Sequence, residues 1–133
     1  SCRLVADQDP GAVGEAMRAF VAEHTPPGAR TEVKMYAGAR PVLLRRDSAA
    51  LRAGADALAE AFGAETTLIR CGASVPVTEL FQRLLGMDPV LMGFGLPDDN
   101  IHSPNEKFDL AQFHGGIVAA AAFLQNLAAT AGV

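Results

Sequence analysis

Residues 89–107 read PVLMGFGLPDDNIHSPNEK, and this stretch decides which fold class the sequence predicts. Its first part, residues 89–94, is nearly continuous apolar sequence, as expected for a central strand that is buried on both faces of a sheet. Its second part, residues 95–107, is polar and indicates a long loop. We therefore expect a buried strand that carries a polar loop at the end of a sheet, where α/β proteins bind their ligands.

Helical and extended patterns alternate on both sides of this stretch. Four candidate helices carry start or stop signals, namely Asp9-Pro10, Asp47-Ser48, Gly86 and Asp109. Short extended segments lie between them, at residues 2–5, 31–36 and 66–70. From residue 48 onward, the order helix, strand, helix, strand, helix predicts an α/β layer with a mostly parallel sheet. Residues 1 to about 36 predict a strand-helix-strand unit.

Composition and charge argue against several classes of function. The chain has 133 residues, half of them hydrophobic and a fifth charged, which is typical of a globular protein. The net charge is −4 and Arg45-Arg46 is too short a basic run to follow phosphates, so we expect no nucleic-acid partner. The apolar stretch 115–124 is too short to span a bilayer, and no signal peptide is visible, so we expect no membrane partner. Cys2 and Cys71 predict two free thiols in a reducing cytoplasm.

The polar loop contains one candidate metal ligand, His102. Carboxylates and amides surround it in the sequence, and a neutral imidazole in such a setting can bind zinc. A solvated loop with an incidental histidine is the alternative. A zinc site needs three or four protein ligands. His24 and His114 share no motif with His102, so the sequence alone does not complete a metal site.

Two further segments are candidates for binding a substrate. Ser74 follows Gly72 at a predicted strand-to-helix turn, where backbone amides can bind an anion. Capping of the next helix is the alternative role for Ser74. Arg3 lies in the first extended segment, and its planar guanidinium can hold a carboxylate. An ordinary surface arginine is the alternative there.

Taken together, these segments resemble the zinc metallopeptidases that include carnosinase-type dipeptidases, aminoacylase, glutamate carboxypeptidase and succinyl-diaminopimelate desuccinylase. SCRLV at residues 1–5 and QDP at residues 8–10 resemble the second half of that family's lid, or dimerisation, domain. RCGASVP at residues 70–76 resembles its Arg-Glu-Gly-Gly-Ser-Ile-Pro turn, with Cys71 and Ala73 as departures. Residues 93–107 resemble its last active-site loop. The order and spacing of the three motifs are most similar to the dipeptidase branch.

The resemblance implies a role for each matching residue. His102 matches the last ligand of a two-zinc site, Arg3 the lid arginine that holds the substrate carboxylate, and Ser74, beside Gly72, a turn residue at that same end of the substrate. The family's remaining zinc ligands and its general base have no counterpart here, so we expect no catalytic residue in this segment. The implied cofactor is a pair of zinc ions per intact subunit, with cobalt or manganese as alternatives. The implied reaction is hydrolysis of a dipeptide or N-acyl amino acid by a zinc-bridged water.

The resemblance also implies a division of the chain. Residues 1–43 match half of a ferredoxin-like α/β lid, and residues 44–133 match the C-terminal segment of an α/β zinc-hydrolase domain. We expect the upstream part of the same polypeptide to complete the site, the intact enzyme to form a homodimer through the lid, and the 133 residues alone to be inactive. Two alternatives are a non-catalytic dimerisation or binding module, in which residues 1–36 pair edge to edge with a second copy, and an inactive family member.

Overall fold

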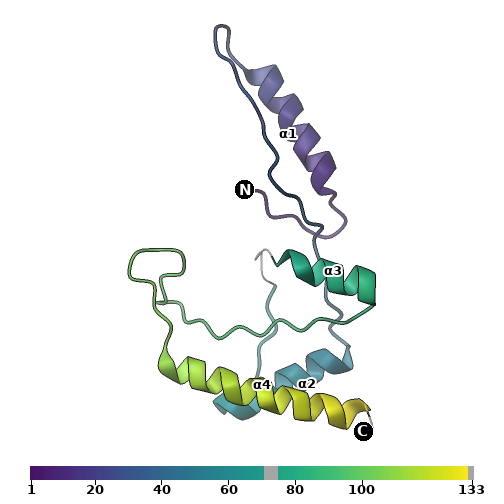
Figure 1. Cartoon of the computed structure of the whole chain (residues 1–133), viewed down its shortest axis with the longest axis vertical. Helices are drawn as coiled ribbons and strands as arrows, with labels where there is room; N and C mark the ends of the chain where they lie inside the picture. Colours follow the sequence, from purple (N-terminus) through teal and green to yellow (C-terminus); the bar gives the residue numbers. More distant parts are fainter. Residues whose placement is uncertain (71–74, 132–133) are drawn as a thin grey trace. The chain divides into compact units, whose positions relative to one another are not determined.

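The computed structural model describes residues 1–70 and 75–131 of the chain (Figure 1). The helices in those residues are α1 (Pro10–His24), α2 (Ala49–Phe62), α3 (Pro76–Leu85) and α4 (Leu110–Ala131). The chain divides into two compact units. The first comprises Ser1–Leu43 and Arg70–Met87, and the second comprises Leu44–Ile69 and Asp88–Val133.

The predicted α/β fold with a mostly parallel sheet is wrong, because the described residues form helices and no strand. The segments expected to be strands, residues 2–5, 31–36, 66–70 and 89–94, have no regular secondary structure. A sheet needs a second segment whose backbone groups pair with the first. An apolar pattern specifies an extended backbone and its buried face, but it does not specify that partner. For the same reason, the ferredoxin-like strand-helix-strand fold predicted for residues 1–43 is wrong, and α1 is the regular element of that region.

In the first unit, α1 begins where the sequence predicts. Asp9 is its N-cap and accepts a hydrogen bond from the backbone N–H of Ala12 at 3.0 Å, and Pro10 occupies the first turn. Met35, from the segment that follows α1, packs so closely on Gly14 that a Cβ atom added there would overlap its side chain. The start of α1 is therefore fixed by local capping, and its packing depends on a glycine.

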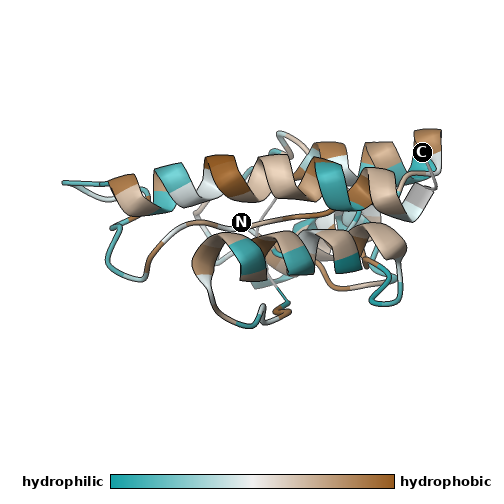
Figure 2. Cartoon of the chain, turned by 90° about the horizontal axis from the view of Figure 1, so that it is seen from below, coloured by the Kyte–Doolittle hydropathy of each residue, from teal (hydrophilic) through white to brown (hydrophobic). Residues whose placement is uncertain are grey.

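The second unit is built on the contact between α2 and α4, which lie side by side (Figure 2). The most buried side chains of the two helices are small: Ala53, Ala57, Ala119 and Ala122. Asn126 of α4 also donates a hydrogen bond to the carbonyl of Ala53 at 3.4 Å. Small side chains on the facing sides let two helix backbones approach closely. Larger apolar side chains of the two helices are more exposed: Phe62 is 37% exposed, and Ile117 and Leu124 are 55% and 66% exposed.

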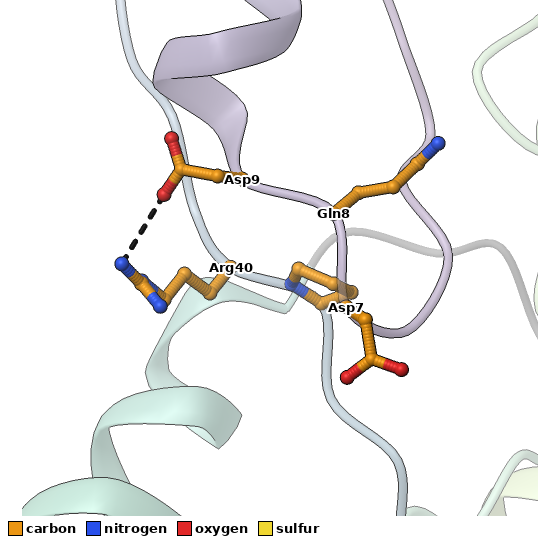
Figure 3. A pocket seen from close by; sticks show the side chains of 5 residues that line it. Asp7, Gln8, Asp9 and Arg40 are labelled. Carbon is orange, nitrogen blue, oxygen red and sulfur yellow. Dashed lines mark hydrogen bonds and ion pairs between the residues drawn. The ribbon is translucent and has the colours of Figure 1, made fainter.

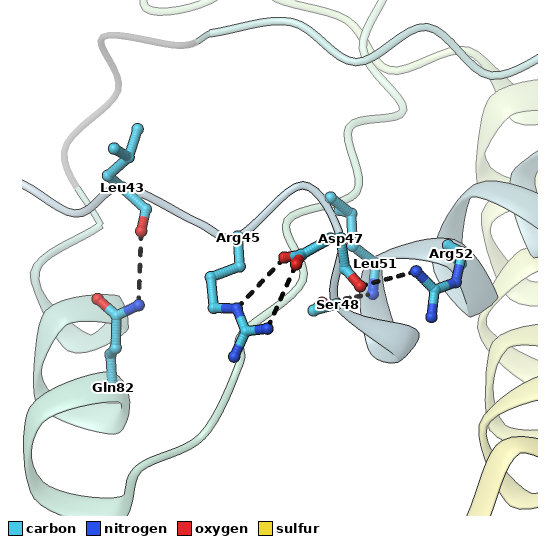
Figure 4. A network of polar contacts seen from close by, with 7 residues as sticks. All are labelled: Leu43, Arg45, Asp47, Ser48, Leu51, Arg52 and Gln82. Atoms are coloured by element: carbon cyan, nitrogen blue, oxygen red, sulfur yellow. Dashed lines mark hydrogen bonds and ion pairs between the residues drawn. The ribbon is translucent and has the colours of Figure 1, made fainter.

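Polar contacts fix the start of α2 (Figure 4). Ser48 is the N-cap, and its Oγ accepts a hydrogen bond from the backbone N–H of Leu51 at 3.1 Å. Just before it, Arg45 donates to Asp47, with Nε 3.3 Å from Oδ1. This hydrogen bond raises the pKa of Arg45 and lowers the pKa of Asp47. The predicted N-cap at Ser48 is thus confirmed.

The apolar segment 89–94 joins the helix pair to the polar loop. Val90, Met92 and Phe94 are half-buried, whereas Leu91 between them is 55% exposed. These half-buried side chains pack on glycines of the two helices. Val90 and Met92 lie against Gly54 of α2, and Phe94 lies against Gly116 of α4. Burial on both faces was therefore a wrong prediction, because one face of this segment meets the helices and the other does not.

The last helix, α4, follows the polar loop directly. Asp109 Oδ1 accepts hydrogen bonds from the backbone N–H groups of Ala111 at 2.8 Å and Gln112 at 3.4 Å, which confirms the predicted cap. With 22 residues, α4 is the longest helix of the described residues. No helix in residues 1–70 or 75–131 combines the length and the apolar character needed to cross a membrane.

Candidate functional site: the His102 loop

The polar loop of residues 96–107 is a chain of tight turns closed at its ends (green loop in Figure 1). Backbone N–H groups donate to carbonyls three residues earlier, from Asp99 to Leu96 at 3.1 Å, from Ser103 to Asn100 at 2.9 Å and from Glu106 to Ser103 at 3.2 Å. The N–H of Lys107 then donates to the carbonyl of Asp99 at 3.0 Å. The loop is thus a defined structure in which His102 lies between two fixed ends.

The backbone of His102 has an uncommon conformation. Its φ angle is 62°, in the left-handed region, and Asn100 and Asn105 share that region with φ angles of 53° and 60°. This region is uncommon for residues other than glycine, although asparagine, aspartate and histidine adopt it several-fold more often than the rest. The hydrogen bonds of the surrounding turns stabilise this conformation. Its backbone N–H also donates to Glu106 Oε2 at 3.3 Å.

Asp99 is the buried carboxylate of the loop, with 2% of its surface exposed. Its Oδ2 accepts a hydrogen bond from the backbone N–H of Leu96 at 2.7 Å. Among the described residues, its Oδ1 is the one buried side-chain oxygen or nitrogen without a hydrogen bond. Lys107 Nζ lies 3.5 Å from that oxygen, so the ammonium offsets the buried charge without a directed hydrogen bond.

Asp98, the neighbouring carboxylate, is exposed and shares the same lysine. Its Oδ2 lies 3.0 Å from Lys107 Nζ, and its side chain is 74% exposed. The hydrogen bond from Lys107 lowers the pKa of Asp98, and the same bond raises the pKa of Lys107. Adjacent aspartates thus have different positions: one is buried within the loop and the other is solvated on its surface.

The loop offers zinc one imidazole and no complete set of ligands. His102 is exposed, and imidazole is a ligand type that zinc prefers. Across residues 1–70 and 75–131, however, no three His, Cys, Asp or Glu side chains come together in a way that could hold a metal ion. His114 belongs to α4, and His24 of α1 stacks on Phe20, with ring centroids 4.0 Å apart. The donor chemistry of His102 fits zinc, but the described residues do not complete a zinc site around it.

The predicted substrate-binding residues lie in a different part of the chain from the loop. Arg3 is exposed and precedes α1 in the first unit, whereas His102 belongs to the second unit. Gly72 and Ser74 lie outside the described residues. The helix after them, α3, begins at Pro76, and its N-cap position is Val75. The roles of Arg3, Gly72 and Ser74 therefore stay predictions.

Two open depressions lie in the first unit. One, of about 350 Å³, is lined by Asp7, Gln8, Asp9, Arg40 and Pro41 (Figure 3). The other, of about 470 Å³, is bordered by Arg40 and by Glu79, Leu80 and Arg83 of α3. Arg40 Nη2 lies 3.2 Å from Asp9 Oδ2, and Arg83 Nε lies 2.5 Å from Glu79 Oε1. Both guanidinium groups are thus matched by carboxylates, so neither depression carries a marked excess of positive charge.

Asp99 lies in the predicted loop, but its burial and its contact with Lys107 were not predicted from the sequence. The signal was the pair Asp98-Asp99 just after the turn-forming residues Gly95 and Pro97, with a lysine at the far end of the loop. That pattern predicts that a carboxylate folds back on the backbone, but not which of the two does so.

Sequence comparison identifies the family. Residues 3–126 match the profile of peptidase family M20/M25/M40. The chain belongs to this peptidase family. The resemblance drawn from the three motifs is thereby confirmed, and it covers nearly the whole chain.

The named relatives of this M20-family chain are metallodipeptidases and dipeptidases. It is 41% identical to Cys-Gly metallodipeptidase DUG1 of Saccharomyces cerevisiae over 64 residues, which are 48% of this chain and 13% of the yeast protein. It is 32% identical to Beta-Ala-His dipeptidase of Homo sapiens over 96 residues, which are 72% of this chain and 19% of the human protein. It is 36% identical to Cys-Gly metallodipeptidase dug1 of Schizosaccharomyces pombe over 75 residues, 56% of this chain and 16% of that protein. The chain thus spans less than a fifth of the length of these relatives.

Proposed function

We propose that this chain is a segment of a zinc-dependent amidohydrolase that cleaves dipeptides or N-acyl amino acids. The observation that supports the proposal most directly is the match to a peptidase family over residues 3–126, together with similarity to dipeptidases from yeasts and mammals. In such enzymes a pair of metal ions polarises the amide carbonyl and supplies a hydroxide at neutral pH. The part assigned to this chain is narrower: one metal ligand and the anchor for one end of the substrate.

His102 is the proposed metal ligand. Its imidazole is exposed, and its backbone is held in one conformation by the turns of the loop. A preset position reduces the entropy that a ligand loses when it binds a metal. Since the described residues hold no set of three ligands, the other ligands and the general base are proposed to come from another part of the same polypeptide.

Arg3, Gly72 and Ser74 form the proposed anchor for the substrate carboxylate. A charge-assisted, forked hydrogen bond from an arginine fixes a carboxylate in both distance and orientation. Hydrogen bonds to charged groups contribute about 1.5–3 kcal/mol, or roughly 10-fold to 100-fold in affinity. Arg3→Ala in the intact protein should therefore raise KM for a dipeptide by about that factor with little change in kcat.

Two variants give this anchor test its control. Arg3→Lys should restore KM in part, because a lysine keeps the charge and loses the fork. Arg30→Ala removes another exposed arginine of the first unit and should leave KM unchanged. A KM in Arg3→Ala that equals the KM in Arg30→Ala would show that Arg3 is an ordinary surface residue.

The division into two functional segments is part of the proposal. Residues 1–43 are assigned to the second half of a lid through which the intact enzyme dimerises, and residues 44–133 to the C-terminal segment of the catalytic domain. The change of compact unit between Leu43 and Leu44 supports this boundary, while Arg70–Met87 groups with the first unit. An oligomeric state measured before and after deletion of residues 1–43 from the intact protein tests the assignment. A dimer that persists without those residues would contradict it.

The activity itself is tested by comparing the intact protein with the 133-residue chain. The intact protein should hydrolyse Cys-Gly, β-Ala-His or an N-acetyl amino acid, lose this activity to a chelator and regain it with zinc. The 133-residue chain should be inactive at any zinc concentration. Zinc-dependent turnover by the short chain would overturn the proposal. An intact protein that dimerises but hydrolyses none of these substrates would instead favour a non-catalytic module or an inactive family member.

A further inference from the structure

Asp99 holds both ends of the His102 loop. At the first end, its N–H and its Oδ2 form hydrogen bonds with the carbonyl and the N–H of Leu96, at 3.1 and 2.7 Å. At the other end, its backbone carbonyl accepts a hydrogen bond from the N–H of Lys107 at 3.0 Å. One residue therefore connects the beginning and the end of the loop, and His102 lies three positions after it.

The burial of Asp99 makes this connection costly to lose. A carboxylate with 2% exposure has given up its hydration and depends on its protein partners. Its Oδ2 has the Leu96 N–H, whereas its Oδ1 has the Lys107 ammonium at 3.5 Å and no hydrogen bond. Without the carboxylate, the N–H of Leu96 would lack its partner and Lys107 would lose the inner of its two carboxylates.

The loop conformation depends on this closure because His102 is in a sparsely populated backbone region, which an unconstrained chain would rarely adopt. Two contacts hold the left-handed φ of 62° at His102. One is the turn that ends at Ser103, and the other is the hydrogen bond from the His102 N–H to Glu106. Both contacts lie inside the ring that the Asp99–Lys107 hydrogen bond closes. Opening the ring would let His102 relax to an ordinary conformation and would change the direction in which the backbone presents its imidazole.

We propose that Asp99 is the positioning residue of this loop, whose buried carboxylate fixes the loop backbone and thereby presets His102 for binding a metal ion. The inference rests on the proposed function of His102 as a zinc ligand. Asp99 itself touches neither metal nor substrate in this account. Its effect on the metal passes through the backbone of the loop, in the way that outer partners orient metal ligands.

The test compares Asp99→Asn with Asp98→Asn in the intact protein. The first variant keeps the size and an acceptor for the Leu96 N–H but removes the buried charge. The second variant removes the exposed carboxylate of Asp98, which pairs with the same lysine, and is the matched control. For each, the zinc dissociation constant is measured by chelator competition, amide hydrogen exchange is followed at Ser103 and Lys107, and overall stability is measured by denaturant unfolding.

Asp99→Asn should weaken zinc binding about 10-fold to 100-fold, the loss typical of altered partners of a metal ligand, and should speed exchange at Ser103 and Lys107. Asp98→Asn should change both by less than about threefold, because an exposed ion pair contributes little. A change in overall stability with zinc affinity and loop exchange unchanged would mean that Asp99 is merely structural, and the inference would fail. If Asp99→Asn does not fold, Lys107→Gln takes its place in the test. This variant keeps the Asp99 carboxylate and removes the ammonium beside it. Unchanged zinc affinity in Lys107→Gln would equally overturn the inference.

A third variant separates this inference from the proposed function. If His102→Ala weakens zinc binding and Asp99→Asn does not, the role of Asp99 is refuted and that of His102 stands. If His102→Ala leaves zinc binding intact, the metal role of His102 is refuted, and the positioning role falls with it.

Discussion

Gly54 should be a position where an added methyl group destabilises the second unit instead of stabilising its helix. A Cβ atom built at Gly54 lies 2.8 Å from Val90 Cγ1, 3.7 Å from Met92 Sδ and 3.8 Å from Phe123 Cδ2. Replacing a helical glycine by alanine gains about 1 kcal/mol of helix propensity. Overpacking costs about 1–3 kcal/mol, and Val90 has little freedom to move its methyl because its side chain is β-branched. Gly54→Ala should therefore lower the free energy of unfolding by about 1 kcal/mol.

A double-mutant cycle isolates this steric effect. Val90→Ala removes the methyl group that the new Cβ atom would meet, so Gly54→Ala in that background should be stabilising by about 1 kcal/mol. The coupling energy between the two substitutions should then be about 2 kcal/mol, which lies within the range seen for residues in contact. The assay is urea unfolding of the chain followed by far-UV circular dichroism.

Gly116→Ala is the matched control for this cycle. Its added Cβ atom would lie 3.4 Å from Phe94 Cγ, at the edge of ordinary contact, so the gain in helix propensity should dominate. If Gly54→Ala stabilises the chain as much as Gly116→Ala does, Val90 does not pack on α2 as described. The segment that leads into the His102 loop would then be held in some other way.

Two further predictions concern the cap of α2 and the loop. Ser48→Ala should lower the free energy of unfolding by about 1 kcal/mol, because the N–H of Leu51 loses its acceptor, and Ser48→Asn, tested in the same unfolding assay, should restore most of it. The hydrogen bond from Lys107 lowers the pKa of Asp98 from its ordinary value of 3.8, so the pair stabilises the folded loop above that value and the contribution is lost as pH falls through the lowered pKa. Amide exchange at Lys107, followed into the acid range and compared with Asp98→Asn, measures this, and an identical pH profile in both proteins would refute it.

The helix boundaries were predictable from sequence because their signals are local. Asp9, Ser48 and Asp109 each accept hydrogen bonds from the first turn of the helix that follows, and Gly86 ends α3 with a left-handed φ of 62°. Each interaction spans a few residues and depends on the identity of one side chain. Four helices were therefore placed correctly without any knowledge of the tertiary structure.

The extended segments were not predictable in the same way. Val90 and Met92 face the helix pair while Leu91 is exposed, a distinction that the continuous apolar run does not carry. Whether such a segment pairs in a sheet depends on a partner far away in sequence, and in the described residues no such pairing forms. The alanines at the contact between α2 and α4 do not stand out in the sequence either, because they carry a weaker hydrophobic pattern than the leucines and phenylalanines beside them.

The candidate site was predictable in residue type but not in arrangement. The resemblance singled out His102 as a ligand, and the polar loop around it was evident from composition. The choice between Asp98 and Asp99 as the inward carboxylate depends on the turn that begins at Leu96, which single-residue preferences do not determine. That choice is the part of the site that required a structure.

Metal content shows whether His102 is a zinc ligand of a metallopeptidase. Zinc per subunit is measured for the intact protein, for His102→Ala and for His114→Ala, whose side chain is exposed on α4. We expect about two zinc ions in the intact protein and in His114→Ala, as in two-metal hydrolases, and about one in His102→Ala. A His102→Ala protein that keeps the full complement of zinc would contradict this expectation.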